Sequence, residues 1–271
     1  MADEAVPFDD RGLAYGDGLF ETVLVRDGHP LLWDAHLRRL ARGAERLEIP
    51  LPDMHTLASL PGQAGTGLFV LKLLVTRGSG GRGYKSPEPP VPRVRWRCMP
   101  FTPQSAYWRD GVRVRLCRLR LGHQPLLAGI KHLNRLENVM ARREWCDADV
   151  AEGVLCDQYG HLVEATSMNL VWQRHGALET PDLTACGVEG TLLATLRRQL
   201  PIHTRKVGSE TLMEADAAWV VNSVQGVWPL RQLDDAAGAC LRRWTMQAEQ
   251  RYLQQHAHPL LGYPHDAFGE A

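Results

Sequence analysis

The stretch "AGIKHLNRLE", residues 128–137, places a lysine between a glycine and an apolar, helix-like segment. Lysines and arginines together number 31, yet lysine occupies only positions 72, 85, 131 and 206. Arginine keeps its proton in proteins, whereas a desolvated lysine can lose it. Lys131 is therefore either a surface side chain or an amine that forms a Schiff base with a carbonyl compound.

The composition excludes several classes of partner. A hydrophobic share of 44% and a charged share of 23% are typical of a globular protein. The net charge of zero indicates neither a nucleic-acid nor an anionic-membrane partner. The acidic start "MADEAVPFDD" lacks the apolar core of a secretory signal. The most apolar run, residues 67–75, contains Lys72 and is far below the roughly 20 residues of a membrane span.

The cysteines and histidines predict no disulfide and no metal. The cysteines lie at 98, 117, 146, 156, 186 and 240, without a CxxC pair or the spacing of a zinc site. Scattered thiols of this kind are typical of a reducing, cytoplasmic compartment. His256 and His258 lie close together but lack further ligands nearby.

Hydrophobic alternation predicts strands, and apolar positions three or four residues apart predict helices. Strands are expected in a hairpin over 18–32 that turns at Asp27-Gly28, then at 68–78, 94–98 and 112–121, in a hairpin over 153–172, and at 217–230. Helices are expected at 33–49, 133–145 and 191–200, and the C-terminal stretch is expected to be a helix with a polar tail. The predicted inward residues are Leu37, Leu40, Ala41, Ala44 and Leu47 in the first helix and Leu133, Leu136, Val139 and Met140 in the second.

Strands and helices mix in two stretches of similar make-up, without strict strand–helix–strand alternation. This pattern predicts an α+β fold in two domains with mixed sheets and flanking helices. The expected division is a smaller N-terminal domain at 1–105, a polar linker at 106–111, and a larger domain at 112–271 that carries Lys131.

A Schiff-base lysine usually indicates pyridoxal phosphate, whose ring nitrogen needs a carboxylate. Glu164 lies in "HLVEATSMN", where alternation through Leu162 turns it inward. A buried carboxylate needs a cationic partner, and a protonated ring nitrogen would be one. The alternative interpretation is that Glu164 is an ordinary glutamate at the edge of a strand.

The phosphate of such a cofactor needs an arginine, hydroxyls and amides at a helix start. Arg39 lies beside the apolar face of the first helix, and Ser223 lies in the bend "VNSVQG". The amides of Thr191 and Leu192 follow the glycine turn "GVEG". Each of these groups also has an ordinary structural interpretation. Arg39, for example, would be a solvated arginine on a helix.

Taken in order, these pieces resemble the fold-type IV pyridoxal-phosphate enzymes, which include branched-chain aminotransferase, D-amino acid aminotransferase and aminodeoxychorismate lyase. The matching motifs are "YGDGLFET" (15–22), "HLRRL" (36–40), "GIKHLNRLE" (129–137), "VEATSMNLVW" (163–172), "GVEGT" (187–191) and "NSVQGVWPL" (222–230). The resemblance implies that Lys131 forms the Schiff base, that Glu164 pairs with the ring nitrogen beside Asn169, and that Arg39, Thr191, Leu192 and Ser223 hold the phosphate. It also implies a homodimer.

Within the family, "TRGSGGRGY" (76–84) and residues 120–139 look most like the lyase, because Arg135 stands near the place of an aminotransferase tyrosine. The resemblance implies conversion of 4-amino-4-deoxychorismate to 4-aminobenzoate and pyruvate, a step toward folate. Arginine forks suit the two carboxylates of that substrate. The candidate substrate residues are Arg77, Arg82, Arg97, Arg135 and Thr22. One departure is Leu192-Leu193 where many members have an arginine.

Three alternatives remain open. The nearest is an aminotransferase for D- or branched-chain amino acids, which would use the same cofactor residues. A nucleotide-binding kinase built on "GSGGRGYKS" is disfavoured because Tyr84, not glycine, precedes Lys85. The third is a pyridoxal-phosphate binder without turnover.

Overall fold

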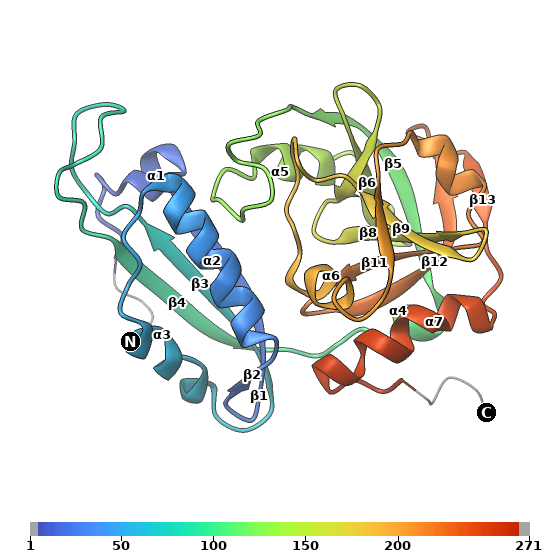
Figure 1. Cartoon of the computed structure of the whole chain (residues 1–271), viewed down its shortest axis with the longest axis horizontal. Helices are drawn as coiled ribbons and strands as arrows, with labels where there is room; N and C mark the ends of the chain where they lie inside the picture. Colours follow the sequence, from blue (N-terminus) through green and yellow to red (C-terminus); the bar gives the residue numbers. More distant parts are fainter. Residues whose placement is uncertain (1–4, 266–271) are drawn as a thin grey trace. The chain divides into compact units, whose positions relative to one another are not determined.

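The computed structural model describes residues 5–265, in which strands and helices are mixed as the predicted α+β class requires (Figure 1). The chain forms two compact units. The first unit ends at Thr102 and also contains Ile130–Arg135, whereas the second contains Pro103–Gly129 and continues from Leu136. Lys131 therefore belongs to the first unit, although it was expected in the C-terminal domain.

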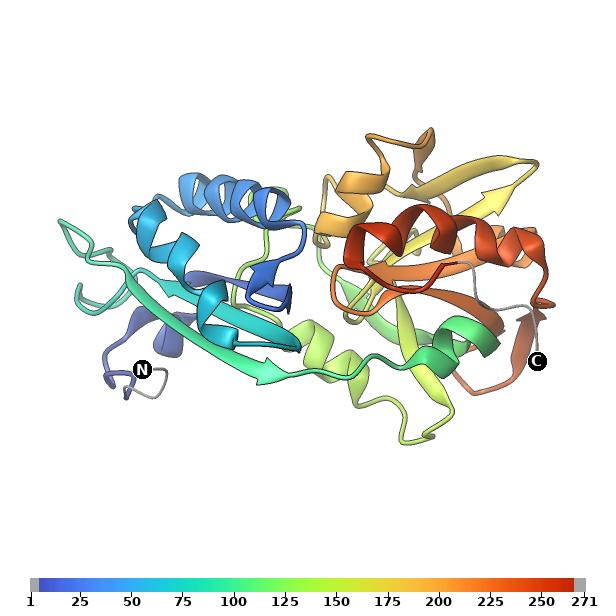
Figure 2. The ribbon, with the colours of Figure 1, turned by 90° about the horizontal axis from the view of Figure 1, so that it is seen from below.

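The first unit is an antiparallel sheet of four strands in the order β2-β1-β3-β4. Its elements are α1 (Arg11–Tyr15), β1 (Gly18–Arg26), β2 (His29–Pro30), α2 (Trp33–Leu47), α3 (Met54–Ser59), η1 (Pro61–Ala64), β3 (Leu68–Thr76) and β4 (Arg93–Pro100). Helix α2 packs against β1 (Figures 1 and 2). The hairpin of β1 and β2 is confirmed, and Asp27 and Gly28 have the positive φ angles of 51° and 78° that a two-residue hairpin turn requires.

The buried side of α2 differs from the predicted apolar face. Leu40 and Ala44 are buried as expected. His36 and Arg39 are buried beside them, whereas three predicted inward residues, Leu37, Ala41 and Leu47, are only half-buried. The helix turns a polar pair toward the sheet because β1 supplies a buried partner for it, described below.

The second unit is a mixed sheet of nine strands in the order β10-β9-β8-β11-β12-β5-β6-β7, with β13 added beside β12. The strands are β5 (Val112–Leu121), β6 (Val150–Asp157), β7 (Leu162–Ala165), β8 (Asn169–Arg174), β9 (Ala177–Pro181), β10 (Ile202–Arg205), β11 (Ala217–Asn222), β12 (Gly226–Asp234) and β13 (Cys240–Arg243). The helices are α4 (Ser105–Asp110), α5 (Leu136–Arg142), α6 (Thr191–Leu196), η2 (Ser209–Met213), α7 (Ala248–Ala257) and η3 (Pro259–Leu261). The predicted hairpin of β6 and β7 is confirmed.

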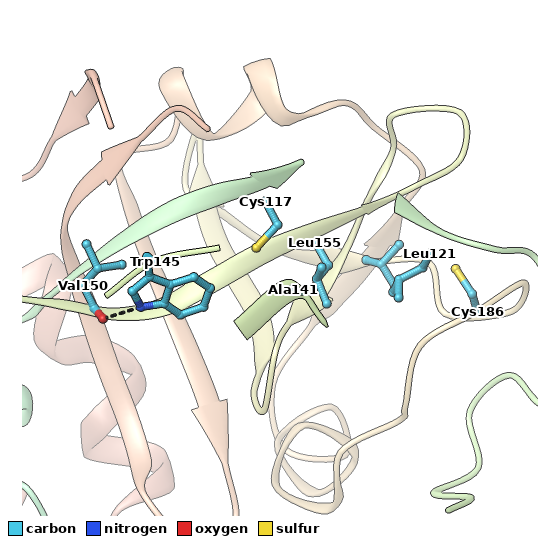
Figure 3. Close-up of a cluster of buried hydrophobic side chains, with 8 residues drawn as sticks. Cys117, Leu121, Ala141, Trp145, Val150, Leu155 and Cys186 are labelled. Atoms are coloured by element: carbon cyan, nitrogen blue, oxygen red, sulfur yellow. Dashed lines mark hydrogen bonds between the residues drawn. The ribbon is translucent and has the colours of Figure 1, made fainter. Parts of the chain in front are cut away.

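One core cluster of this unit fixes α5 against the sheet (Figure 3). It contains Cys117, Leu121, Ala141, Trp145, Val150, Leu155, Val163 and Cys186. The Trp145 Nε1–H donates to the carbonyl of Val150 at 2.9 Å, so the largest side chain in the cluster also has its polar atom satisfied.

The predicted packing of the second helix is wrong. Helix α5 begins only at Leu136, and Leu136, Val139 and Met140 are 70%, 53% and 52% exposed. Ala141 is the buried residue of the helix. Residues before Leu136 run beside β1 instead of forming helix, so the helix is shorter and faces the core with a different side.

Two segments expected to be polar connections are packed. The expected linker at 106–111 lies mostly in α4, where Trp108 is buried and its Nε1–H donates to the carbonyl of Gln225 at 2.6 Å. The expected polar tail contains His258, which is fully buried against the rings of Trp108 and Tyr263. Helices α4 and α7 both contact β12, and burial of these aromatic rings holds the two segments to the second unit. The end of the expected tail, from residue 266, lies outside the described residues.

Candidate functional site

Lys131 lies on an extended segment beside β1, not at the junction of a loop and a helix. The Phe20 N–H donates to the carbonyl of Lys131 at 3.0 Å, and the Leu133 N–H donates to the carbonyl of Gly18 at 2.9 Å. The Lys131 Nζ lies 4.4 Å from the centroid of the Phe20 ring. Backbone pairing on one side and a ring beneath the amine hold the lysine in place.

Arg39 belongs to a buried polar cluster with Glu21 and His36. Its Nε–H donates to Glu21 Oε1 at 2.8 Å and its Nη2–H to Oε2 at 2.5 Å. His36 Nδ1 lies 2.7 Å from Glu21 Oε2. All three side chains are buried. The cluster therefore orients the guanidinium of Arg39, whose contact with a phosphate stays a prediction.

The charge state of this cluster follows from its partners. Burial alone would raise the pKa of Glu21, but the charge and hydrogen bonds of Arg39, with a hydrogen bond from His36, lower it to about 2. Burial lowers the pKa of His36, against the opposing effect of Glu21. An ionised carboxylate only accepts hydrogen bonds, so neutral His36 carries its proton on Nδ1 and donates it to Glu21.

The structure gives Arg77 a set of partners inside the first unit. Its Nε–H and Nη2–H donate to the two oxygens of Asp17 at 2.8 and 3.0 Å. Its Nη1–H and Nη2–H also donate to the carbonyls of Glu48 and Leu47 at 2.8 and 2.6 Å. Burial alone would raise the pKa of Asp17, but the hydrogen bonds and charges of Arg77 and Arg11 lower it. These bonds favour a structural role for Arg77 at the end of α2 over contact with a substrate carboxylate.

Two other candidates share a face of the sheet with a residue that the sequence did not single out. Thr22 pairs with Lys72, and Lys72 pairs with Arg97, so the three side chains form a row across β1, β3 and β4. Alternation places Phe20 on the same face, and Lys72 Nζ lies 5.7 Å from its ring centroid. Lys72 and Arg97 are both exposed there. A lysine inside an otherwise apolar strand was the feature of the sequence that could have pointed to Lys72.

The remaining substrate candidates lie elsewhere in the first unit. Arg82 is exposed in the connection between β3 and β4. Arg135 donates from its Nε–H to the carbonyl of His132 at 3.0 Å. Burial, and then the charges of Arg135 and Lys131, lower the pKa of His132 to about 4. The imidazole of His132 is therefore uncharged at neutral pH.

In the second unit, Glu164 and Asn169 hold the turn that enters α6. Glu164 Oε2 accepts from the Val188 N–H at 2.9 Å. Asn169 Oδ1 accepts from the Gly190 N–H at 2.9 Å, and its Nδ2–H donates to the carbonyl of Val188 at 2.9 Å. Both side chains are buried. The inward orientation predicted for Glu164 is confirmed. Glu164 and Asn169 both bond to the same backbone turn, at Val188 and Gly190.

Two glycines in this turn are required by close approach. A Cβ at Gly190 would lie 2.0 Å from Asn169 Oδ1. Gly187 has a φ of 85°, and a Cβ there would lie 2.7 Å from a methyl of Val163. The turn leads into α6, which starts at Thr191 and ends at Leu196, before the predicted end at 200. The first-turn amides of a helix point along its axis, which suits an anion.

The backbone that leads to Lys131 is tied to the same turn. The Gly129 N–H donates to the carbonyl of Gly187 at 2.9 Å, and the Glu189 N–H donates to the carbonyl of Gly129 at 3.3 Å. Lys131 follows two residues later. Within the second unit, Glu164, Asn169 and Gly129 are thus all bonded to residues 187–190.

Ser223 lies in the turn between β11 and β12 and is buried. Asn222 shapes this turn, because its Oδ1 accepts from the Val224 and Gln225 N–H groups at 2.9 and 2.6 Å. The Tyr263 hydroxyl donates to the carbonyl of Val224 at 2.6 Å. Sequence reasoning found the serine but not Asn222 or the C-terminal tyrosine that holds its turn.

The donor groups present are of the kinds that pyridoxal phosphate needs. Residues 5–265 contain no group of three or more His, Cys, Asp or Glu side chains that could hold a metal ion. They do contain a lysine over an aromatic ring, a buried carboxylate beside a glycine turn, and a helix start after it. An aldehyde needs an amine, a ring nitrogen needs a carboxylate and a phosphate needs backbone amides, so each feature is compatible with this cofactor.

Comparison with known proteins agrees with this chemistry. The family model described as "Amino-transferase class IV" matches residues 18–233. An aminodeoxychorismate lyase of Vibrio harveyi is 34% identical over 237 residues, which cover 83% of this chain and 86% of that protein. A D-alanine aminotransferase of Staphylococcus epidermidis is 25% identical over 279 residues, which cover 94% of this chain and 95% of that protein.

A solved structure is similar over nearly the full length. The crystal structure of 4-amino-4-deoxychorismate lyase from Pseudomonas aeruginosa is 41% identical, with a TM-score of 0.87, and covers 98% of this chain and 97% of that one. The predicted fold type is therefore confirmed. By its family match and by these full-length similarities, the chain belongs to the amino-transferase class IV family.

Proposed function

We propose that this chain is a pyridoxal-phosphate-dependent carbon–oxygen lyase that converts 4-amino-4-deoxychorismate to 4-aminobenzoate and pyruvate in folate biosynthesis. The observation that carries the proposal is similarity over more than four fifths of the chain to proteins named as this lyase, at 34% and 41% identity. The arginine at position 135, near the place where aminotransferases have a tyrosine, supports the same choice.

Pyridoxal 5′-phosphate supplies an aldehyde for the amine of Lys131 and a ring that withdraws electrons from the bond being broken. Lys131 removes the proton from the amine-bearing ring carbon of the substrate and returns a proton to the departing pyruvyl oxygen. Glu164 would hold the ring nitrogen in its protonated form, because a buried carboxylate is stabilised by a cation. Loss of the pyruvyl group leaves an aromatic ring, which drives the elimination.

The phosphate is assigned to the amides of Thr191 and Leu192, to Ser223 and to Arg39. The Asn169 bonds to Val188 and Gly190 support this assignment, since they fix the turn before the helix start. The ion pair with Glu21 supports a preoriented Arg39. Leu192-Leu193 in place of an arginine leaves the amides as the main donors on this side.

The substrate carboxylates are assigned to Arg82, Arg97 and Arg135, with Thr22 and Lys72 in the row beside Arg97. The exposure of Arg82, Lys72 and Arg97 and the register of the sheet support this assignment. Arg77 is left out because of its bonds to Asp17 and to the end of α2.

We also propose a homodimer that works in the cytoplasm. The exposed apolar side chains Leu136, Val139 and Met140 on α5, with Leu126 at 72% exposure, support a surface that a second copy covers. The cysteines, all of them free thiols, support a reducing compartment. No helix within residues 5–265 is long and apolar enough to cross a membrane.

Reduction with borohydride tests the cofactor assignment. The chain is incubated with pyridoxal phosphate, reduced, digested and mapped, and the label is expected on Lys131 alone. A label on Lys72, Lys85 or Lys206 instead would overturn the assignment. Release of pyruvate and 4-aminobenzoate from aminodeoxychorismate then tests the reaction.

An aminotransferase is the second candidate, favoured by the D-alanine aminotransferase match over 94% of the chain. Both reactions use the same amine and carboxylate, so the cofactor test does not separate them. Incubation with D-alanine or a branched-chain amino acid, without a keto acid, does. Accumulation of the amine form of the cofactor at a rate above pyruvate release from aminodeoxychorismate would favour the aminotransferase.

A further inference from the structure

Glu152 on β6 is a buried carboxylate that the reaction above does not use. It is 3% exposed. Its Oε2 accepts from the Thr166 N–H at 3.0 Å, the Thr166 hydroxyl at 2.5 Å and the Gly153 N–H at 3.1 Å. Its Oε1 accepts from the hydroxyl of Ser167. Three of these four bonds hold the same two-residue bend.

That bend connects the two strands that carry the predicted cofactor residues. β7 ends at Ala165, just after Glu164, and β8 begins at Asn169. The Ala165 N–H donates to the carbonyl of Met168 at 2.7 Å, so the connection is tight. Thr166 and Ser167 therefore lie in the short connection between Glu164 and Asn169, which both hold the turn at 188–190.

The bend also reaches the serine turn. The Asn222 Nδ2–H donates to the carbonyl of Ser167 at 3.3 Å, and Asn222 Oδ1 holds the Val224 and Gln225 amides. From the other side, the Asn138 Nδ2–H of α5 donates to the carbonyl of Thr166 at 3.0 Å. The hydrogen bonds of Glu152 thus lie at the centre of a network that joins Glu164, Asn169 and Ser223.

All partners of Glu152 within the described chain are neutral hydroxyls and amides. Burial of a carboxylate without a cation is costly, and it raises the pKa of Glu152 against the effect of its donors. Four donors arranged on one side chain offset that cost only if the loop keeps its shape. The carboxylate is therefore suited to holding the loop in one conformation.

We propose that Glu152 is a positioning residue that sets the orientation of Glu164 and Asn169 for the cofactor and, through Ser167 and Asn222, that of Ser223. This inference rests on the proposed pyridoxal-phosphate function. Glu152 acts through the Thr166–Ser167 bend and does not contact the cofactor.

The test measures the dissociation constant of pyridoxal phosphate by absorbance titration of the full-length chain carrying Glu152→Ala, Glu152→Gln or Ser167→Ala. Glu152→Ala is expected to weaken binding about 10-fold or more, the scale of losing a supporting hydrogen-bond partner at a ligand site. Glu152→Gln is expected to stay within about 3-fold, because its oxygen can accept from the amides and its amide can donate to the Ser167 hydroxyl. The dissociation constant of Ser167→Ala is expected to lie between those of Glu152→Gln and Glu152→Ala.

Glu179→Ala is the matched control. Glu179 is also 3% exposed in the same unit, on β9, and accepts from Trp172 and Arg205 rather than from the bend. Its loss is expected to destabilise the unit, and its bonds do not involve the Thr166–Ser167 bend. Urea unfolding without the cofactor puts the variants on one stability scale.

A spectroscopic readout separates positioning from stability. Glu164 sets protonation at the ring nitrogen, so Glu152→Ala is expected to shift the pH midpoint of the absorbance change of the bound cofactor. Glu179→Ala is expected to leave that midpoint unchanged. An unshifted midpoint, with binding equal to the control at matched stability, would overturn the inference.

The two failures are distinguishable. A wild-type chain that takes up no pyridoxal phosphate would overturn the proposed function and this inference together. Normal wild-type binding with unaltered variants would overturn this inference alone. If Glu152→Ala does not fold, Ser167→Ala still decides the matter, since an unchanged dissociation constant and midpoint there would contradict the network.

Discussion

Two buried glutamates in this chain are stabilised in opposite ways. Glu21 in the first unit contacts a guanidinium and an imidazole, and its pKa falls to about 2. Glu152 in the second unit contacts hydroxyls and amides, and burial raises its pKa. The first arrangement fixes a charged side chain, and the second fixes the shape of a loop. The same residue type therefore serves as a counter-ion in one unit and as a structural acceptor in the other.

The largest expected effect comes from the amine of Lys131, the reactive group in the proposed reaction. Lys131→Ala is expected to lower kcat for pyruvate release by about 1000-fold or more, because it removes the group that transfers the proton. Steady-state assay of 4-aminobenzoate formation checks this. Lys85→Ala, in the loop between β3 and β4, is the control and should retain activity near that of the wild type. Equal activity of the two variants would contradict the assignment.

Removing one partner tests the ion-pair half of the comparison. Glu21→Ala leaves the guanidinium of Arg39 buried without its carboxylate, so the free energy of unfolding should fall by about 3–5 kcal/mol. Urea denaturation monitored by tryptophan fluorescence measures it. Glu45→Ala, on the exposed side of α2, should change the free energy by less than about 0.5 kcal/mol. A loss at Glu21 as small as that at Glu45 would mean that the cluster is not held by this pair.

The pH dependence of stability should have opposite signs at the two glutamates. Because the folded-state pKa of Glu21 lies near 2, below its ordinary 4.5, its contribution is present above about pH 4.5 and is lost as the pH falls toward 2. The pKa of Glu152 is raised, so its contribution is present below 4.5 and is lost as the pH rises through the folded-state value. Unfolding free energies of Glu21→Gln and Glu152→Gln, each subtracted from wild type between pH 3 and 7, should therefore slope in opposite directions. Parallel slopes would show that the partners do not decide the charge state.

The smallest expected effects distinguish the arginines of the first unit. Arg97→Gln should raise KM for aminodeoxychorismate about 10-fold with little change in stability, since it removes one charge-assisted contact of a substrate carboxylate. Arg77→Gln should instead lower the free energy of unfolding by about 1–3 kcal/mol, because it removes the bidentate pair with Asp17 and a charged donor to the end of α2. The kinetics and urea midpoints of both variants should differ in this crossed way. The reverse pattern would move Arg77 into the substrate site.

Much of the fold followed from local patterns. The Asp27-Gly28 turn, the strands β3 and β5, and the inward Glu164 were all predicted correctly, since each depends on residues within a few positions of one another. The errors have a common cause. Leu136, Val139 and Met140 have the spacing of a buried face, yet they are exposed because the core selects Ala141 instead.

The candidate site divides in the same way. Its reactive groups were available from motif and residue type: one lysine among four, a glutamate and an asparagine five residues apart, and a glycine turn. Lys72 and Asn222 were missed because their roles depend on strand register and on a turn between strands. Glu152 was missed because its donors in the Thr166–Ser167 bend lie 14 and 15 residues away.

By itself, the sequence determined which functional groups are present and which short segments turn, alternate or start a helix, because covalent order and local sterics decide those properties. Only the tertiary structure decided which glutamate contacts a cation and which contacts hydroxyls, and which arginines pair with Asp17. The burial, the partners and the charge state of a side chain depend on contacts between segments that are distant in the sequence, and a local sequence pattern does not reveal those contacts.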